Sequence, residues 1–219
     1  MSPRGRFITF EGPEGSGKST QLRRLGERLR NAGLDVLETQ EPGGTPIGIQ
    51  IRHVLLDARN RELCATAELL LMFASRAQNV DQLILPALSG GRTVLSDRFT
   101  DSTLVYQGVG RGLGPDVVYD LDRIACRGLV PDLTLLIDID AETGLARAHG
   151  RNARLEGSET QIAETRIEDQ DVAFHRRVRD AYRQLAADES QRVKLIDGSQ
   201  SSEVVAEQVW AAVSTLMNS

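Results

Sequence analysis

The chain has 219 residues, of which 40% are hydrophobic and 26% are charged, and its formal net charge is −5. This length and apolar content predict one domain over residues 1–219 with a sizeable core, and the acidic balance argues against a nucleic acid polymer as a partner. No apolar run approaches about 18 residues and the two cysteines have no metal-like spacing, so we expect a cytoplasmic protein with no membrane partner.

The first predicted elements are a strand over 6–11 and a helix over 18–32, which enclose a glycine-rich loop. The loop matches G-x-x-x-x-G-K-[ST], the phosphate-binding P-loop, in the strand–loop–helix context that this motif requires. Its glycines let the backbone wrap around a polyphosphate, while its N–H groups and the helix N-terminus attract the negative charge. The loop therefore predicts a nucleoside triphosphate site, with Lys18 on the β- and γ-phosphates and the Ser19 hydroxyl on Mg²⁺. The residues of this predicted site are Gly12, Pro13, Glu14, Gly15, Ser16, Gly17, Lys18, Ser19 and Thr20.

Short apolar runs and helical periods alternate along the rest of the chain. Further strands are predicted over 34–39, 92–97, 132–138 and 192–196, and further helices over 46–56, 66–88, 115–128, 141–149, 168–188 and 202–216. This alternation is typical of a three-layer α/β fold, here a P-loop NTPase fold with a five-stranded parallel sheet flanked by helices. Ligands of such a sheet bind at the carboxyl ends of its strands. Residues 150–166 are polar and lack periodicity, which predicts a short lid.

The P-loop alone does not choose among GTPases, ATPase motors and small-molecule kinases. The chain lacks the guanine-reading N-K-x-D, the D-x-x-G of a GTP switch and the apolar run ending in Asp-Glu that is typical of ATPase motors. Instead, residues 97–108 read D-R-F-T-D-S-T-L-V-Y-Q-G, which closely resembles the D-R-[YFH]-x-x-S-x-x-[AV]-Y-Q-G signature of bacterial thymidylate kinases. Residues 41–46 (E-P-G-G-T-P), 67–78 and 131–138 resemble three further stretches of that family, in register from about residue 6 to 216.

The resemblance implies transfer of the γ-phosphoryl group of ATP to dTMP, which gives dTDP for dTTP synthesis. It also implies dependence on Mg²⁺ and a homodimer. The apolar helix predicted over 66–88 is a reasonable dimer face, although a helix packed against the sheet has the same pattern. ATP, Mg²⁺ and dTMP are therefore the expected ligands.

The acceptor in such a reaction is a phosphate oxygen that is already anionic near neutral pH, so catalysis needs positioning and charge cancellation rather than a strong base. Arg98 and Arg52 match the dTMP-phosphate ligands of the family, a role that suits a guanidinium fork. Asp97 ends a predicted strand facing the P-loop, where a carboxylate can hold Mg²⁺. Glu14 matches a family carboxylate that orients the acceptor side or the water shell of the metal. The alternatives are a salt bridge for Arg98, a helix cap for Asp97 and a solvent-facing charge for Arg52 and Glu14.

Thymine recognition is expected on the helix over 66–88. Thymine O4 accepts a hydrogen bond where cytosine N4 donates one, and Arg76 carries only donors, so Arg76 should favour thymine. Gln107 or Thr103 is expected to complete the base edge. In the family an aromatic residue one helical turn before this arginine stacks on the base; here the two candidates are Met72 and Phe73, with core packing as the alternative for both.

Three more residues of the matched motifs complete the substrate site that the resemblance implies. Tyr106 resembles the residue that crowds the sugar C2′ and excludes ribonucleotides, while Ser102 and Glu41 stand in the two motifs that follow the third and second strands. Arg192 and the turn over 197–199 are expected near adenine.

A catalytic arginine is expected from the lid, because the variable positions of the P-loop contain none. Arg151 and Arg154 are the first candidates, ahead of Arg147 and Arg166. A lid arginine stabilises transition-state charge and closes over ATP to exclude water.

Two other functions remain open on the residues alone. A deoxynucleoside kinase on a related fold phosphorylates a sugar hydroxyl and needs a general base, for which Glu41 is suitably placed. A non-catalytic P-loop nucleotide-binding module predicts loss of Lys18, Asp97 or the lid arginines, yet all are present.

Overall fold

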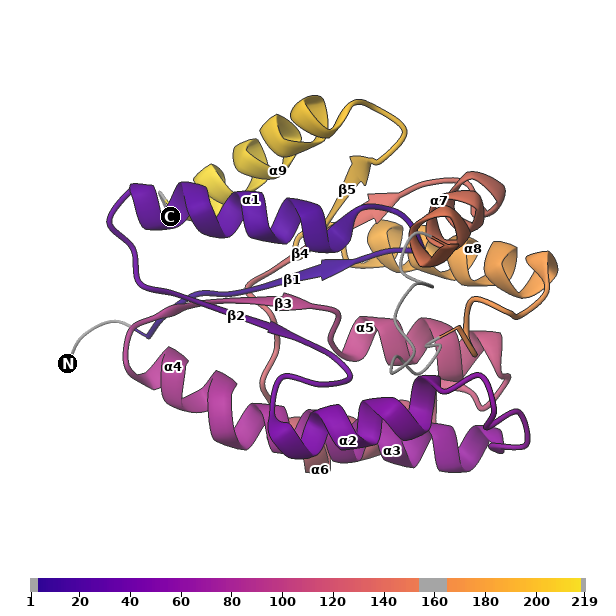
Figure 1. Ribbon diagram of the computed structural model, residues 1–219. Coiled ribbons are helices and arrows are strands. Elements are labelled where there is room, and N and C mark those ends of the chain that lie inside the picture. Colours follow the sequence, from indigo (N-terminus) through magenta and orange to yellow (C-terminus); the bar gives the residue numbers. More distant parts are fainter. Residues whose placement is uncertain (1–3, 154–164, 218–219) are drawn as a thin grey trace.

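Five parallel strands form one sheet at the centre of the protein, whose computed structural model describes residues 4–153 and 165–217 (Figure 1). The strands are β1 (Phe7–Glu11), β2 (Val36–Gln40), β3 (Thr93–Asp97), β4 (Leu133–Asp138) and β5 (Val193–Asp197). Their spatial order is β2-β3-β1-β4-β5, and each neighbouring pair is parallel. The sheet confirms the predicted α/β class and all five predicted strands.

Helices lie on both sides of this sheet (Figure 1). On one side are α1 (Lys18–Asn31) and α9 (Ser202–Met217), and on the other are α2 (Pro46–Leu56), α3 (Ala65–Asn79), α4 (Leu85–Ser89) and α6 (Pro115–Cys126). Two further helices, α7 (Ala141–Ala153) and α8 (Val172–Asp188), lie beside the carboxyl ends of the strands. This arrangement gives the three layers that the alternation of elements predicts.

Each interface between the layers has its own apolar core. Phe10 and Leu25 belong to the core under α1 and α9, and Phe7 belongs to the core under α3 and α6. A third cluster joins the segment after β3 to α8 and includes Tyr106 and Tyr182. Because this third cluster lies next to the carboxyl ends of the strands, it fixes α8 against the edge where ligands of a parallel sheet bind.

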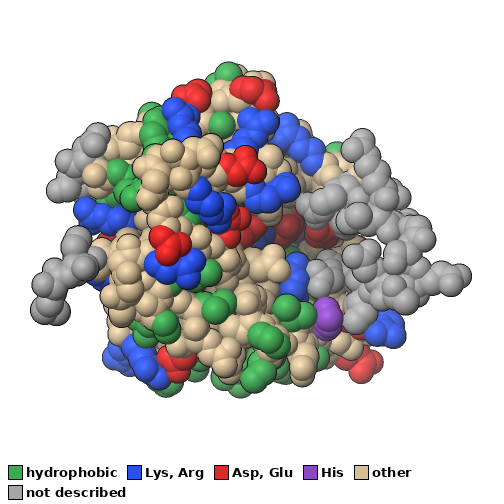
Figure 2. Space-filling model, turned by 60° about the vertical axis from the view of Figure 1, so that its left-hand side comes forward, with side chains coloured by type: hydrophobic (Ala, Val, Ile, Leu, Met, Phe, Trp, Pro, Cys, Tyr) green, Lys and Arg blue, Asp and Glu red, His purple; other side chains and the backbone are tan. Residues whose placement is uncertain are grey.

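Opposite charges are interspersed on the surface, where basic and acidic side chains lie next to one another (Figure 2). Salt bridges Arg24–Glu203 (3.1 Å) and Arg28–Glu207 (2.8 Å) join α1 to α9. Exposed pairs of this kind contribute little to stability, so the apolar core between the two helices holds them together.

The helix predicted over 66–88 is interrupted in the structure. A π-helical turn, η1 (Val80–Ile84), separates α3 from α4. The physical reason is Pro86, which lacks an N–H group and whose ring crowds the carbonyl four residues earlier. A wider turn before the proline accommodates this missing bond without ending the helix.

Three other segments differ from the sequence prediction. After β3 the chain forms α5 (Thr100–Thr103) and the π-helical η2 (Leu104–Gly110), where no helix was expected. The helix predicted over 141–149 continues to residue 153, so the first residues of the predicted lid are helical, and residues 154–164 lie outside the described part. The helix predicted from 168 begins at 172, because the side chain of Asp171 caps its N-terminus by accepting from Phe174 N–H at 2.6 Å.

Candidate active site

The P-loop lies between the end of β1 and the start of α1, at the centre of the sheet edge. Gly12, Gly15 and Gly17 adopt positive φ angles of 138°, 67° and 96°, which turn successive backbone groups into a compact loop. A Cβ atom on Gly15 would clash with the carbonyl oxygen of Gly144 in α7. The loop is therefore packed against α7 as well as against the sheet.

Lys18 and Ser19 are the first two residues of α1, directly after the loop. The Lys18 ammonium donates to the carbonyl oxygens of Gly12 (3.0 Å) and Pro13 (2.8 Å). Burial and the nearby Arg98 lower the pKa of Lys18 to about 8. The Ser19 hydroxyl donates to the Asp97 carboxylate, so a hydroxyl and a carboxylate oxygen stand together beside the P-loop.

Arg98 is the cation that joins this loop to the segment after β3. Its guanidinium donates to Glu14 Oε1 (2.6 Å), to the hydroxyls of Ser102 (3.0 Å) and Tyr182 (3.3 Å), and to the carbonyl of Gly12 (3.4 Å). It also lies 4.9 Å from the centre of the Tyr106 ring, whose hydroxyl contacts Glu14 at 3.2 Å. The structure thus brings together four predicted residues, namely Glu14, Arg98, Ser102 and Tyr106.

The protonation state of Glu14 follows from these contacts. Burial raises its pKa, but the charges of Arg98 and Lys18 outweigh burial and lower the pKa to about 2. Glu14 is therefore a carboxylate at every physiological pH, and it balances two of the cations that face the P-loop.

Two residues of this cluster, Glu11 and Tyr182, were missed by the sequence analysis. Glu11 ends β1 directly before the P-loop and is fully buried, and its carboxylate accepts from the hydroxyl of Tyr182 at 2.9 Å. The position of Glu11 next to the P-loop is a signal that was available in the sequence. Tyr182 lies on α8 and carries no such signal, because only the tertiary fold brings it to the loop.

Arg76 forms a second buried centre, between α3 and the segment after β3. It is 2% exposed, and its guanidinium donates to Glu41 (2.6 Å), the carbonyl of Phe99 (2.9 Å) and the hydroxyl of Thr103 (2.9 Å). Asn79 donates to the other oxygen of Glu41 at 3.0 Å and was not predicted. One terminal nitrogen of Arg76, Nη1, has no hydrogen-bond partner among the described residues. That nitrogen is a buried donor whose hydrogen-bonding capacity the described residues leave unused.

The neighbours of Arg76 on α3 divide into core and surface. Phe73 is buried in the core with its ring 4.9 Å from the guanidinium of Arg76, whereas Met72 is only half-buried.

Gln107 of η2 is not bonded to Arg76, because its amide donates to Glu68 at 2.7 Å. Of the two residues expected on the base edge, the structure brings Thr103 to Arg76 and turns Gln107 to a different carboxylate.

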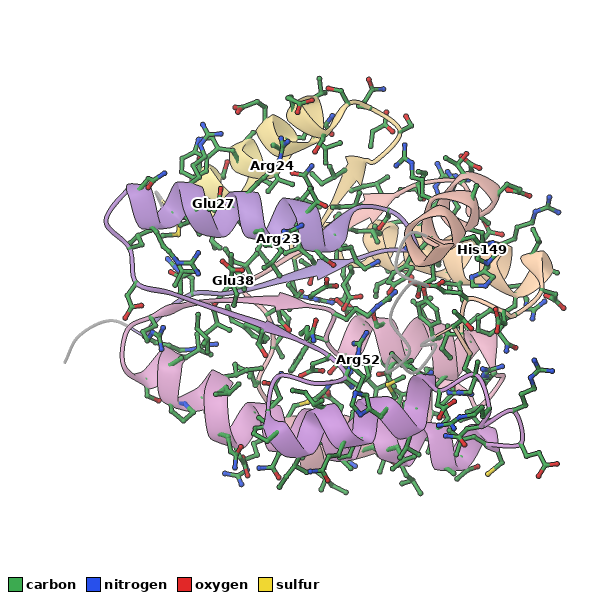
Figure 3. All side chains as sticks on the ribbon, viewed as in Figure 1. Arg23, Arg24, Glu27, Glu38, Arg52 and His149 are labelled. Carbon is green, nitrogen blue, oxygen red and sulfur yellow. The ribbon has the colours of Figure 1, made fainter. Side chains whose placement is uncertain are left out.

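Arg52 lies on α2 and contacts the turn that follows β2. Its guanidinium donates to the carbonyl of Pro42 at 3.0 Å, and Figure 3 shows the side chain on the side of α2 that faces the sheet. Arg52 is therefore held at the ligand edge by the E-P-G-G-T-P segment rather than directed into solvent.

Arg192 is not brought to the P-loop. Arg192 directly precedes β5, so it lies at the amino ends of the strands, opposite the carboxyl ends where the P-loop is. Its guanidinium is bonded to Asp101 (2.7 and 3.0 Å) and to Thr134 (2.7 Å). The turn after β5 does lie at the ligand edge, where Arg147 of α7 donates to the carbonyl of Gly198 at 3.3 Å. The structure therefore separates two features that the sequence analysis grouped at adenine.

The arginines predicted for the lid lie in different surroundings or outside the described residues. Arg151 belongs to α7, although its side chain is not described, and Arg154 lies outside the described residues. Arg166 is 5% exposed, with an ion pair to Glu68 at 2.7 Å and a hydrogen bond to the carbonyl of Leu55. Arg166 is thus a buried structural cation rather than a mobile lid residue.

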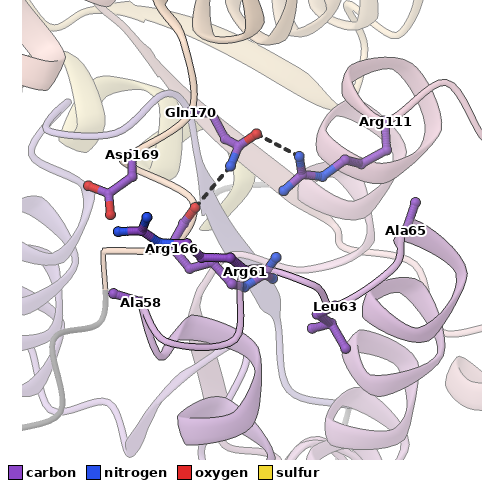
Figure 4. Close-up of a pocket in the computed structure, with 8 residues that line it drawn as sticks. All are labelled: Ala58, Arg61, Leu63, Ala65, Arg111, Arg166, Asp169 and Gln170. Atoms are coloured by element: carbon purple, nitrogen blue, oxygen red, sulfur yellow. Dashed lines mark hydrogen bonds between the residues drawn. The ribbon is translucent and has the colours of Figure 1, made fainter.

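Arg166 also lines a pocket of about 700 Å³ (Figure 4). Gln170 bridges two of its walls, because it accepts from Arg111 at 2.7 Å and donates to the carbonyl of Arg166 at 3.1 Å. The lining residues are Ala58, Arg61, Leu63, Ala65, Arg111, Arg166, Asp169 and Gln170. None of them was predicted for the substrate site except Arg166, as a lid candidate.

The P-loop lies at the centre of a five-stranded parallel sheet, and Arg98, which follows the neighbouring strand β3, is bonded to it. These features define the class of protein as a P-loop phosphotransferase that acts on small anionic substrates. The chain belongs to the thymidylate kinase family, whose sequence profile, described as "Thymidylate kinase", matches residues 10–209. This confirms the resemblance found in the sequence.

Individual relatives agree over nearly the whole chain. A thymidylate kinase of Solidesulfovibrio magneticus is 48% identical over 96% of this chain and 100% of its own length. One of Oleidesulfovibrio alaskensis is 50% identical over 94% of this chain and 96% of its own. The crystal structure of thymidylate kinase from Ehrlichia chaffeensis has 30% sequence identity and a TM-score of 0.75, and the match covers 97% of this chain and 99% of that one.

Proposed function

We propose that this chain transfers the γ-phosphoryl group of ATP to dTMP, giving ADP and dTDP. The observation that carries the proposal is the bonding of Arg98 to the P-loop residues Gly12 and Glu14, which places a fixed cation where a second phosphate can meet the first. Membership of the thymidylate kinase family supports the choice of substrates. Among the described residues no helix is long and apolar enough to cross a membrane, and we assign the protein to the cytoplasm.

On the donor side, the P-loop residues 12–19 hold the phosphates of ATP. The N–H groups at the start of α1 face the β-phosphate, and the Lys18 ammonium leaves its carbonyl partners to contact the β- and γ-phosphates. The anionic phosphates raise the pKa of Lys18 again, because they outweigh the burial that lowers it in the free protein. Thr20 follows on the first turn of α1 and completes the predicted nucleotide site. One of the lid arginines, Arg151 or Arg154, adds charge at the transferring group.

The residues beside the P-loop fit Mg²⁺. A hydroxyl and a carboxylate oxygen, from Ser19 and Asp97, stand together there, and Mg²⁺ prefers oxygen ligands, of which the protein often supplies only one or two. Among the described residues no group of three or more His, Cys, Asp or Glu is arranged as a metal cage, which suits an ion that arrives with the nucleotide. Such an ion neutralises charge on the β- and γ-phosphates.

On the acceptor side, Arg98 and Arg52 bind the dTMP phosphate and hold one of its oxygens in line with the γ-phosphorus. No side chain has to remove a proton, because the acceptor oxygen is already anionic near neutral pH. Glu14 remains charged with its pKa of about 2 and keeps Arg98 oriented. Tyr106 stands over Arg98 and limits the space at the sugar.

Thymine is read by Arg76. Its unpartnered Nη1 is buried, and a buried N–H group without a partner carries a desolvation cost of about 1–3 kcal/mol that a carbonyl acceptor removes. Thymine O4 is such an acceptor, and cytosine offers an amino group instead. Met72 is the residue that we assign to contact with the base, because Phe73 is buried in the core.

We also propose that two copies of the chain associate through α2, α3 and α6. These neighbouring helices expose large apolar side chains, which costs free energy unless another surface covers them. The exposed residues are Ile47, Ile49, Val54, Leu70, Val117, Tyr119 and Ile124. Sedimentation equilibrium should give twice the chain mass, and Ile124→Glu should shift the distribution towards the monomer.

A deoxynucleoside kinase is the nearest competing function, with Glu41 as its base. The structure disfavours that role because Glu41 is 4% exposed and both of its oxygens are occupied, by Arg76 (2.6 Å) and Asn79 (3.0 Å). A carboxylate held in a buried ion pair is a poor proton acceptor for a substrate hydroxyl.

The test is ADP release from Mg-ATP with dTMP, dUMP, dCMP and thymidine as parallel acceptors. Strong turnover with dTMP, weaker turnover with dUMP and none with dCMP or thymidine is the expected result. Turnover with thymidine alone contradicts the proposal that the acceptor is a nucleoside monophosphate. Absence of ADP release with all four acceptors favours a non-catalytic binding module.

A further inference from the structure

Glu11 is a fully buried carboxylate that no step of the proposed reaction uses. Its Oε1 accepts from the N–H groups of Phe99 (2.7 Å) and Ser102 (3.3 Å). Its Oε2 accepts from the hydroxyls of Ser102 (2.5 Å) and Tyr182 (2.9 Å). These four donors come from the segment after β3 and from α8, so one carboxylate ties both of them to the end of β1.

The same two hydroxyls face Arg98. Its Nη1 donates to the oxygen of Ser102 at 3.0 Å and to that of Tyr182 at 3.3 Å. A hydroxyl has one hydrogen to donate and lone pairs to accept with. When each hydroxyl donates its hydrogen to Glu11, its oxygen is left to accept from Arg98. An ionised Glu11 therefore orients both acceptors towards the guanidinium.

The backbone of Arg98 also depends on this carboxylate. Arg98 has a φ of 72°, in the left-handed region that is unfavourable for a residue with a Cβ atom. Three bonds hold this conformation: Arg98 N–H to Phe10 O (2.9 Å), the Ser96 hydroxyl to Arg98 O (2.7 Å), and Phe99 N–H to Glu11. The third fixes the peptide group directly after Arg98.

We propose that Glu11 and Tyr182 act as positioning residues that hold the backbone and guanidinium of Arg98 in the geometry that binds the acceptor phosphate. The inference rests on the proposed function, since it takes Arg98 as the ligand of the dTMP phosphate. Neither residue touches the substrate; both act through Arg98.

The charges around Glu11 make its control of Arg98 sensitive to pH. Burial and Asp101 of α5 raise the pKa of Glu11 to about 7, against the opposing influence of Arg98 and of its hydrogen bonds to Ser102 and Tyr182. The charge of Lys18 in α1 also interacts with Glu11. The pKa of Tyr182 is raised by burial and by Glu11, so its hydroxyl keeps its hydrogen. A protonated Glu11 must itself donate to one hydroxyl and so disturbs the orientation of both.

The first experiment compares Tyr182→Phe and Glu11→Gln with the wild-type chain in steady-state kinetics. We expect the KM for dTMP to rise about tenfold or more with the KM for ATP nearly unchanged, because only the acceptor phosphate loses an oriented partner. Thr215→Val is the control, since it removes a hydroxyl from an exposed side chain on α9, away from the site and from the proposed dimer face. Equal losses for both substrates, together with a lowered melting temperature, would mean that the two residues only support the fold.

The second experiment places Tyr182→Phe in an Arg98→Ala background. If Tyr182 acts through Arg98, it should have no further effect on the KM for dTMP there, whereas additive effects overturn the inference. A readout that needs no turnover is the ¹⁵N–¹H resonance of the Arg98 side chain. In the wild type it should titrate with a midpoint near pH 7, and in Glu11→Gln it should not. A wild-type chain that fails to phosphorylate dTMP but shows this titration refutes the proposed function while the coupling of Glu11 to Arg98 stands.

Discussion

The buried ion pair between Arg76 and Glu41 allows the stability of the fold to be separated from recognition of the base. Both side chains are 2% exposed, and their closest atoms are 2.6 Å apart. Replacing Arg76 with Met removes the cation but leaves the Glu41 carboxylate buried, with the amide of Asn79 as its remaining side-chain partner. Removing one partner of a buried pair costs about 3–5 kcal/mol.

For a chain of this length, that cost lowers the melting temperature by roughly 6–20 °C. The loss should depend on pH. Burial already raises the pKa of Glu41, and removing Arg76 takes away the charge that opposes this effect. The folded variant then binds a proton that the unfolded chain does not bind until lower pH, so its stability increases as the pH falls. The deficit relative to wild type should be smaller at pH 6 than at pH 8.

The assay is urea unfolding of Arg76→Met, of Arg76→Met/Glu41→Gln and of the wild type at both pH values. The double variant should recover about 2 kcal/mol or more, because no buried charge is left unpaired. It should not recover affinity for dTMP, because the donor to thymine O4 is still missing. Arg123→Met is the control, as Arg123 and Asp120 form a 2.7 Å pair with side chains 78% and 69% exposed. The reasoning would be refuted if Arg76→Met lost no more unfolding free energy than Arg123→Met, or if Arg76→Met/Glu41→Gln were no more stable than Arg76→Met.

Three further predictions concern the P-loop and its ligands. Gly15→Ala should raise the KM for ATP about tenfold, because the added Cβ clashes with the carbonyl of Gly144, and it should leave dTMP binding measured by calorimetry unchanged. Gly33→Ala is the control: this glycine has a φ of 86° and open space around it, so the substitution should lower stability and leave the KM for ATP unchanged. Lys18→Met should lower kcat by roughly 10²–10³-fold in single-turnover measurements, since it removes a cation from the transferring phosphates; an unchanged kcat would exclude Lys18 from the reaction. Excess EDTA should stop turnover while the melting temperature of the nucleotide-free chain stays constant, because the described residues hold no metal cage.

Much of this architecture could be predicted from local sequence signals. The strands are short apolar runs next to turn residues, and the P-loop joins the first strand to a helix with a regular leucine stripe, so periodicity alone locates them. The π-helical turn over 80–84 could not be located in this way, because it changes the hydrogen-bond spacing without changing the apolar pattern. Pro86 was the available signal of an interruption.

Site residues that belong to a sequence motif could be predicted, whereas site residues that are brought in by tertiary contacts could not. The sequence identified Arg76 and Glu41 separately, but their ion pair joins residues 35 positions apart. Tyr182 meets Glu11 across 171 positions. Arg192 illustrates the opposite case: it is the first residue of the predicted strand over 192–196, and the polarity of a parallel sheet already places that end away from the ligand edge.

The central claim is that the acceptor is the phosphate of dTMP, and ³¹P NMR of a reaction of the wild-type chain with Mg-ATP and dTMP tests it most directly. We predict that the phosphomonoester signal of dTMP disappears as new α- and β-phosphate signals of dTDP and ADP appear, without free inorganic phosphate. A dTMP signal that stays constant while ATP falls to ADP and inorganic phosphate, or a new phosphomonoester formed only when thymidine replaces dTMP, would contradict the account.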